Sequence, residues 1–366
     1  MFTVDARPQS TLKAKSEDRL QPLSAHFGRR EFLTGATAIG AGLLISRSLR
    51  AAQGAKEAPH RIDVHNHVTP ASYAAELGSK HLLSQPVMNW TPEKDLEDMD
   101  RAGVATSILS LAPPGVWNGD EAAARRLARS CNEEAARIVA DHKGRFGMFV
   151  NLPLPDVDGS LHEIEYGLDM LKGDGVAMYT SYGDKWLGDP AFNPVFDELN
   201  RRGAVVYTHP KSANCCKNVL AKIPDSEIEY GTDTTRAITQ LVFSGTTRRC
   251  PNVRIIFSHA GGTMPFLIER FVNLAKGPEF ASQFPQGFLA EAAKLYYDTA
   301  QTSNAAAMSA LLKVAPVSQI LFGTDFPFRT AADHVKGLKE CGVFTAKNLR
   351  DIDRENAVRL LPRYKT

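Results

Sequence analysis

The chain has 366 residues and a formal charge of +2 at pH 7, from 43 lysines and arginines against 41 aspartates and glutamates. Residues 1–52 hold 8 of these basic and 4 of these acidic residues, so the remainder carries a formal charge of −2. A near-neutral chain offers no electrostatic case for binding nucleic acid. The length exceeds one small domain and suits a β/α barrel of about 250 residues or more with extensions.

The first 52 residues have the pattern of an export signal and linker. Arg29 and Arg30 precede a weakly hydrophobic, Gly/Ala-rich stretch at residues 33–45, and small residues follow at Ala51 and Ala52. This order is typical of a twin-arginine signal, and a disordered arm with a chance arginine pair is the alternative. Because a bilayer span needs about 20 residues, we expect no stable membrane insertion. The pattern predicts a partner in the twin-arginine export machinery and a periplasmic or secreted protein.

Eight short apolar segments, rich in β-branched and aromatic residues, predict strands that alternate with helices. The predicted strands are residues 62–65, 107–111, 147–151, 175–179, 205–209, 253–259, 295–298 and 320–324. The predicted helices are residues 91–102, 121–142, 189–202, 232–249, 263–275, 304–314 and 331–340. Strands that are apolar along nearly their whole length favour an α/β fold, a closed (β/α)8 TIM barrel over residues 60–363. An open doubly wound sheet is the alternative, which is weakened because no Gly-x-Gly-x-x-Gly follows the first strand.

The cysteines do not suggest a disulfide framework. Their number is five, so at least one thiol stays unpaired within the chain. Cys215 and Cys216 are adjacent, and a disulfide between neighbours is strained. We therefore expect buried or free thiols. The adjacent pair lies in residues 210–231, which resemble a long loop of the kind that builds substrate pockets in barrels.

Residue types that bind metals recur at the ends of predicted strands. His65 and His67 end or follow the first strand and share one face, because side chains alternate along a strand. His209 ends the fifth strand and Asp325 follows the eighth. Since the C-terminal strand ends of a barrel form its active-site face, these four residues predict a site for one divalent ion. Zinc suits the imidazoles best and manganese is possible, whereas core histidines and a helix-capping Asp325 are the structural alternatives.

His259 and Asp325 are the candidate catalytic residues. A histidine beside a metal-bound water can orient that water or take its proton, and Asp325 can bind the metal or carry a proton. His259 could instead be another ligand. Three nitrogens and one carboxylate already leave an open position for water or substrate, which favours the acid/base role. The fourth strand and the residue after it, residues 175–180, offer neither an acid nor a lysine to bridge two ions, which predicts a mononuclear centre.

Four motifs, in chain order, resemble those of the amidohydrolase superfamily. They are Asp-Val-His-Asn-His at 63–67, Thr-His-Pro at 208–210, Ser-His-Ala-Gly-Gly at 258–262 and Gly-Thr-Asp-Phe-Pro at 323–327. More narrowly, the chain resembles the branch of aminocarboxymuconate semialdehyde decarboxylase, which includes nonoxidative decarboxylases of hydroxybenzoates and methylsalicylate. This resemblance implies one metal held by His65, His67, His209 and Asp325, with His259 activating water or handling the proton.

The resemblance also suggests substrate-binding residues. Trp186 stands where relatives place a pocket aromatic, and Phe326 would flank the substrate, while packing in the core is the alternative for both. Arg329 and Lys211, near the two motifs that contain Asp325 and His209, are candidate partners of the substrate carboxylate. The semialdehyde decarboxylase has a substrate-binding arginine after its first strand. The corresponding residues 79–84 contain no arginine, and a lysine would lack its bidentate grip.

These observations predict a mononuclear metal-dependent decarboxylase of a small aromatic or unsaturated carboxylic acid. A hydrolase of a lactone, ester or amide that uses the same metal-activated water is the alternative, and a hydratase is a third possibility. A binding protein with a relict barrel is disfavoured because a relict site should have lost some of its ligands. Relatives are often dimers, so a homodimer is possible.

Overall fold

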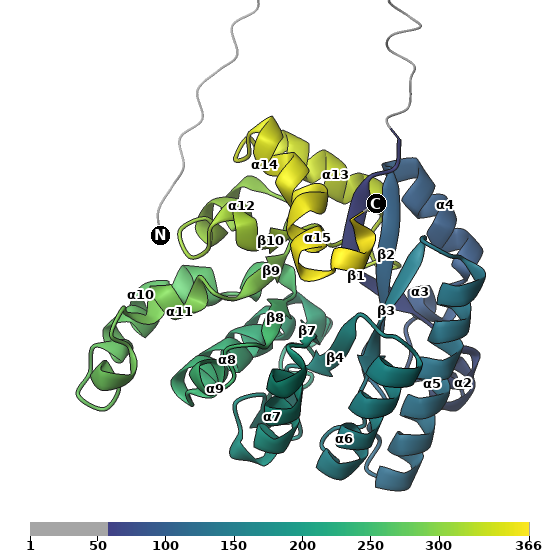
Figure 1. The fold of residues 1–366 in the computed structure, drawn as a ribbon, viewed down its shortest axis with the longest axis horizontal. Coiled ribbons are helices and arrows are strands. Elements are labelled where there is room, and N and C mark those ends of the chain that lie inside the picture. The colour runs from purple at the N-terminus through teal and green to yellow at the C-terminus, as the bar shows by residue number, and fades with distance from the viewer. Residues whose placement is uncertain (1–57, 366) are drawn as a thin grey trace, which may run out of the picture. The chain divides into compact units, whose positions relative to one another are not determined.

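The structure, a computed structural model, describes residues 58–365, and the predicted export signal lies outside them. Eight parallel strands form one sheet in the order β1-β2-β3-β4-β7-β8-β9-β10. The two ends of the sheet meet where the backbone N–H of Val64 donates to Phe322 at 3.0 Å and that of His67 donates to Phe326 at 2.9 Å. Figure 1 shows the strands with helices around them. The prediction of a (β/α)8 barrel is confirmed.

The elements alternate along the chain as predicted, with some additions. The barrel strands are β1 Arg61–Val68, β2 Val104–Leu111, β3 Phe146–Asn151, β4 Gly175–Tyr179, β7 Val205–His209, β8 Arg254–Phe257, β9 Tyr296–Asp298 and β10 Ile320–Leu321, and β5 Ser181–Tyr182 pairs with β6 Lys185–Trp186 in a separate hairpin. The longer helices are α4 Pro92–Ala102, α5 Glu121–Asp141, α6 Val157–Glu165, α7 Asn193–Arg202, α8 Glu229–Phe243, α10 Met264–Ala275, α12 Ala305–Leu311 and α13 Ala331–Glu340. The short helices are α2 Ala71–Tyr73, α3 Gln85–Met88, α9 Thr246–Arg249, α11 Phe288–Ala292, α14 Ala346–Arg350 and α15 Asn356–Leu360.

Local signals set the helix ends where the sequence predicted them. The hydroxyl of Thr91 accepts a hydrogen bond from the backbone N–H of Lys94, and α4 then ends at Gly103, whose φ of 68° suits glycine. The predicted helix 232–249 is instead divided into α8 and α9. Gly245 lies between them with a φ of 81°, a left-handed conformation that ends a helix.

Helix α6 was not predicted because its sequence carries weak helix formers near its start. Gly159 and Ser160 lie in its first turn, and the helix begins where the carboxylate of Asp156 accepts from the backbone N–H of Gly159 at 3.0 Å. The cap and the packing of α6 against the barrel outweigh this low propensity. Propensity is thus a weak guide where tertiary packing decides.

A register shift in β1 brings the two histidines to the interior. Asp63 pairs with Ser107 of β2 but Asn66 pairs with Leu109, so β1 has one residue more than β2 between these pairs. Such a bulge changes which side of the strand faces the barrel. Val64, at the bulge, belongs to the interior cluster, while the rings of His65 and His67 meet in the site above it, with their centres 5.1 Å apart.

Two apolar clusters hold the barrel together. The larger one fills the space between strands and helices. The smaller one lies inside the barrel, where Phe149 and Tyr207 stack with ring centres 5.3 Å apart, and it includes Leu360 and Leu361 at and after the end of α15. Figure 1 shows α15 beside β1 and β10. The C-terminal helix therefore covers the end of the barrel where the strands begin, and the opposite end stays open for a site.

Within residues 58–365, no helix combines the length and the apolar character needed to cross a membrane.

Candidate metal centre and active site

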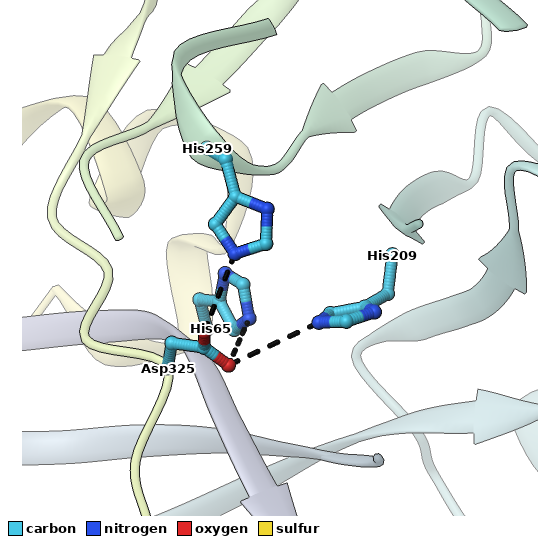
Figure 2. A group of neighbouring side chains, drawn as sticks. All are labelled: His65, His209, His259 and Asp325. Atoms are coloured by element: carbon cyan, nitrogen blue, oxygen red, sulfur yellow. Dashed lines mark hydrogen bonds and ion pairs between the residues drawn. The ribbon is translucent and has the colours of Figure 1, made fainter. Parts of the chain in front are cut away.

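Five buried side chains meet where the barrel strands end. His65 and His67 lie on β1, and His209 is the last residue of β7. His259 begins the turn η6 (His259–Gly261) after β8, and Asp325 follows β10. Figure 2 shows the imidazoles of His65, His209 and His259 around the carboxylate of Asp325. The parallel barrel thus brings together residues that are far apart in the sequence.

The two oxygens of Asp325 face different partners. Oδ1 lies 2.9 Å from Nε2 of His67, 3.1 Å from Nε2 of His65 and 3.9 Å from Nε2 of His209. Oδ2 lies 3.3 Å from Nε2 of His259 and accepts a hydrogen bond from Nε2 of Gln301 at 3.1 Å. Oδ1 therefore faces the imidazoles of three histidines, and Oδ2 contacts His259 and the side-chain amide of Gln301.

The tautomers of two histidines are set from outside the cluster. Nδ1 of His65 donates to Oδ2 of Asp298 at 2.8 Å, and Nδ1 of His209 donates to the carbonyl of Pro210 at 2.7 Å. An imidazole that donates through Nδ1 has its lone pair on Nε2 when it is neutral, so Nε2 is the atom that each ring would offer to a metal ion in the cluster. Neither Nε2 atom has a hydrogen-bond partner within the described residues. Buried lone pairs beside a carboxylate suit a divalent cation.

The burial of the cluster controls its charges. Desolvation lowers the pKa of His67, and it lowers that of His209 to about 3, so both rings are neutral. Burial alone would also lower the pKa of His65, but the carboxylates of Asp298 and Asp325 raise it to about 10. Burial would raise the pKa of Asp325, yet the nearby histidines hold it well below its ordinary value. In the metal-free chain the positive charge therefore rests on His65, and a metal ion would replace it.

Left-handed backbone is concentrated at this site. His259, Gln301 and Asp325 have φ values of 53°, 57° and 64°, which L-residues adopt at a cost. Gly262, in the turn after β8, has a φ of 66°, and a Cβ there would collide with the carbonyl of Gly231. Gly262 is thus required by a turn that packs closely on the first turn of α8.

A cavity of about 1320 Å³ opens over the cluster. His209, His259 and Asp325 lie in its wall, together with Lys211 and Gln301. The remaining wall comes largely from the loops after β1, β2, β4, β7 and β9, and includes Leu82, Pro113, Trp117, Ser181, Asn214, Tyr230 and Phe328. The cluster is therefore accessible from a space that would hold a small organic substrate.

Lys211 places a positive charge in the cavity wall. Its Nζ lies 4.9 Å from the ring centre of Tyr182 and 5.4 Å from that of Tyr179. These rings stabilise a cation, although burial lowers the pKa of Lys211 to about 8. No carboxylate pairs with it among residues 58–365, so its charge is free to bind an anionic substrate.

Comparison with known proteins identifies the family. The model of the amidohydrolase family matches residues 62–363. The 6-methylsalicylic acid decarboxylase of Penicillium expansum is 36% identical over 317 residues, which cover 83% of this chain and 97% of that protein. A crystal structure of an amidohydrolase II is similar with a TM-score of 0.76 and 26% identity, over 82% of this chain and 99% of that one. The chain belongs to the amidohydrolase family. These findings confirm the prediction of an enzyme from the decarboxylase branch of the superfamily.

A solved relative shows a metal in this fold. The dihydroxybenzoic acid decarboxylase of Polaromonas sp. JS666 was crystallised with bound manganese and the inhibitor 2-nitroresorcinol. It is similar to this amidohydrolase with a TM-score of 0.69, over 83% of this chain and 97% of that one, but it is only 19% identical. That likeness shows the shared fold, while the case for a metal here rests on the cluster itself.

The compact ligand group of the amidohydrolase differs from the predicted one by a single histidine. Ligand atoms of His65, His209, His259 and Asp325 all lie within 4.8 Å of one another, which is the arrangement of one metal site. The predicted set has His67 in place of His259. His67 nevertheless contacts Asp325, so the structure brings all five residues together, and the choice of fourth ligand stays a prediction.

The predicted substrate-binding residues have different positions in the amidohydrolase. Lys211 lines the cavity, but the residues along its wall do not include Trp186, Phe326 or Arg329. The indole Nε1 of Trp186 donates to Asp233 at 2.6 Å, and both aromatic side chains pack against the apolar core. Phe328, two residues after Phe326, is the aromatic of that segment that lies in the wall. The position of a residue within a sequence motif therefore did not predict whether its side chain faces the cavity.

Three groups with a direct role in the geometry were not predicted. Asp298 contacts His65, Gln301 contacts Asp325, and the rings of Tyr179 and Tyr182 surround Lys211. Asp298 had a usable signal, because it is an acid at the end of a predicted strand, as Asp325 nearly is. The other contacts depend on the conformation of loops, which carries no signature in the sequence.

The expectation of unpaired cysteines is partly wrong. A disulfide joins Cys215 to Cys216 in the turn η4 (Asn214–Cys216), while Cys131, Cys250 and Cys341 are free. Asn214 and Lys217, on either side of the pair, line the cavity. Residues within the loop 210–231 thus line the cavity over the cluster.

Proposed function

We propose that this amidohydrolase removes carbon dioxide from a small aromatic 2-hydroxy acid of the methylsalicylate type. The observation that carries the proposal is that one cavity contains both a cluster suited to a metal ion and the positive charge of a lysine. Its floor presents Asp325 and imidazole lone pairs suited to a cation, and its wall presents the unpaired ammonium of Lys211. A carboxylate with an adjacent hydroxyl matches this pair. The relative from Penicillium expansum, whose name gives 6-methylsalicylic acid as its substrate, supports this choice.

The reaction replaces the carboxylate of the ring with a proton. A divalent ion in the cluster would supply positive charge that holds and polarises the oxygens of the substrate. His259 and Asp325 hold the proton between Nε2 and Oδ2, and it passes to the ring carbon that bears the carboxylate. The bond from that carbon to the carboxylate then breaks, its electrons return to the ring, and carbon dioxide leaves. The ammonium group of Lys211 orients the substrate by attracting the negative charge of the substrate carboxylate.

The test is carbon dioxide release from 6-methylsalicylate by the metal-loaded chain. Release that a chelator abolishes, with 3-methylphenol as the second product, supports the proposal. Related hydroxybenzoates and muconate-type acids would then define the substrate range. A protein shown to hold metal that releases no carbon dioxide from any of these acids, but cleaves lactones or esters, would be a hydrolase instead.

We propose one zinc ion as the native metal, with manganese as the alternative. Imidazole and carboxylate ligands suit both ions, and manganese is the ion reported in the Polaromonas decarboxylase. Metal analysis of the purified chain would give the stoichiometry. Chelation followed by addition of zinc or manganese alone would then show which ion restores turnover.

We also propose export by the twin-arginine route to the periplasm or beyond. The sequence pattern around Arg29 and Arg30 supports this, although residues 1–57 lie outside the described structure. Replacing both arginines with lysine should leave the chain folded but retain it in the cytoplasm of a bacterial host. Cell fractionation measures this, and an unchanged distribution of the protein between fractions would contradict the proposal.

A further inference from the structure

Asp298 is a buried acid that touches both halves of the site. It is the last residue of β9 and has no exposed surface. Its Oδ2 accepts from Nδ1 of His65 at 2.8 Å. Its Oδ1 accepts from the backbone N–H of His259 at 2.9 Å and from that of Ala300 at 3.0 Å. One carboxylate therefore connects a metal-binding histidine of β1 to the turn that carries the proposed proton donor.

The contact with His65 determines which nitrogen can bind metal. A carboxylate only accepts hydrogen bonds, so Nδ1 of a neutral His65 must carry the proton and Nε2 must carry the lone pair. That Nε2 lies 3.1 Å from Oδ1 of Asp325 and has no hydrogen-bond partner in the described part of the chain. With the other tautomer, an N–H would point into the metal site and the ligand would be lost.

The contact with His259 fixes a residue in an uncommon conformation. His259 has a φ of 53°, which costs free energy and persists only where neighbouring groups hold it. Its backbone N–H points to Asp298, and its side chain Nε2 points to Oδ2 of Asp325. Asp298 thus holds the backbone from which the imidazole reaches the proposed proton-transfer position.

We infer that Asp298 is a positioning residue with two roles. It keeps the proton of His65 on Nδ1, so that Nε2 can bind the metal, and it holds the backbone of His259 in the position that proton transfer requires. The inference rests on the proposed metal-dependent function. It also makes a claim about the imidazole of His65 that is measurable without turnover, namely that Nδ1 carries the proton in the metal-loaded chain.

Asp298→Asn is the decisive substitution because an amide cannot satisfy both sets of donors. If its oxygen accepts from His65, its NH2 group faces the backbone N–H groups of His259 and Ala300. If its oxygen accepts from those backbone groups, its NH2 group faces Nδ1 of His65 and favours the wrong tautomer. Either orientation damages one half of the site while nearly preserving the volume of the side chain.

A matched control is available at the other end of the barrel. Asp174 lies just before β4, has a buried carboxylate, and accepts from the backbone N–H of Met148 at 2.9 Å. Asp174→Asn makes the same chemical change to a buried carboxylate outside the site. It should reduce stability but leave the dissociation constant for zinc unchanged.

The experiment measures zinc affinity by competition with a chelator, and the tautomer of His65 by 15N NMR of the zinc-loaded chain. We expect Asp298→Asn to bind zinc about 10- to 100-fold more weakly than the Asp174→Asn control, or to lose kcat at saturating zinc if the amide keeps the His65 contact. Zinc affinity and metal-saturated kcat both within twofold of the control would overturn the inference. An Nε2-protonated His65 in the wild-type chain would overturn it even if the variant failed to fold.

The outcomes separate this inference from the proposed function. A wild-type chain that binds zinc but decarboxylates no acid would disprove the function and leave the role of Asp298 to be judged from the zinc affinities. A wild-type chain that binds no divalent metal would overturn both proposals. Asp298→Glu, which retains a carboxylate, should restore part of the zinc affinity lost in Asp298→Asn, whereas a merely volume-filling role would give no such rescue.

Discussion

Nε2 of His67 lies 2.9 Å from Oδ1 of Asp325, closer to that carboxylate than the nitrogen of any other histidine in the cluster. This contact places His67 among the metal-binding candidates even though the most compact ligand group contains His259 in its place. The two histidines face different oxygens of Asp325. Their roles are therefore separable by substitution.

His259→Ala should keep one bound metal ion per chain and lose about 10²- to 10⁴-fold in kcat, because it removes the proposed proton donor but no predicted ligand. His67→Ala should lose metal. Metal analysis after gel filtration, combined with single-turnover kinetics, measures both effects. Loss of metal from His259→Ala and its retention in His67→Ala would make His259 the fourth ligand.

Asp325→Asn should abolish detectable turnover. Both oxygens of Asp325 are in use, Oδ1 beside the histidines and Oδ2 beside His259 and Gln301, and an amide can replace only one of them. The far-UV circular dichroism should remain that of the wild type. Near-normal rates of carbon dioxide release from this variant would remove Asp325 from the mechanism.

Gln301→Leu should lower kcat about 10- to 100-fold with little change in KM. The substitution removes the amide that donates to Oδ2 of Asp325 at 3.1 Å, and a hydrogen bond to a charged acceptor contributes about 1.5 to 3 kcal/mol. Gln319→Leu is the matched control, because the amide of Gln319 donates to backbone carbonyls of Ala293 and Lys294, outside the site. Equal rates for the two variants would show that the Gln301 contact is not used in the reaction.

Lys211→Met should raise KM about tenfold or more while affecting kcat less, because it deletes the unpaired positive charge of the cavity wall but keeps an unbranched side chain of similar size. Lys347→Met serves as the control, since Lys347 is exposed and pairs with Asp351 on the surface. Initial rates across a range of 6-methylsalicylate concentrations give both constants. A KM unchanged in Lys211→Met would assign the substrate carboxylate to another group.

Asp95→Asn should reduce the dependence of stability on pH. Burial raises the pKa of Asp95 from 3.8 to about 8, despite hydrogen bonds from Asn66 and Trp90. A carboxyl whose folded pKa is raised favours folding below its unfolded pKa, and this contribution is lost as the pH rises toward the folded pKa. Between pH 6 and 8 the wild type should thus lose about 2 kcal/mol through Asp95, and the variant should not. Urea unfolding at both pH values measures the difference, and equal losses in the two proteins would contradict the assignment.

The barrel and the residues that meet at its mouth could be predicted from the amino-acid sequence. Alternating apolar strands and helices predict the fold because only parallel strands covered by helices bury such segments. The positions of His65, His67, His209, His259 and Asp325 at or after strand ends then follow, since all C-terminal strand ends of a barrel lie on one face.

The orientation of these residues and the groups that surround them depend on tertiary contacts. The pairing of His65 with Asp298 joins residues 233 positions apart, and nothing local to either residue encodes it. The conformation of the loops determines that Lys211 faces the cavity, while the indole of Trp186 hydrogen-bonds to Asp233. Strand patterns arise from periodic burial along the chain, whereas the direction of a loop side chain depends on packing between distant segments.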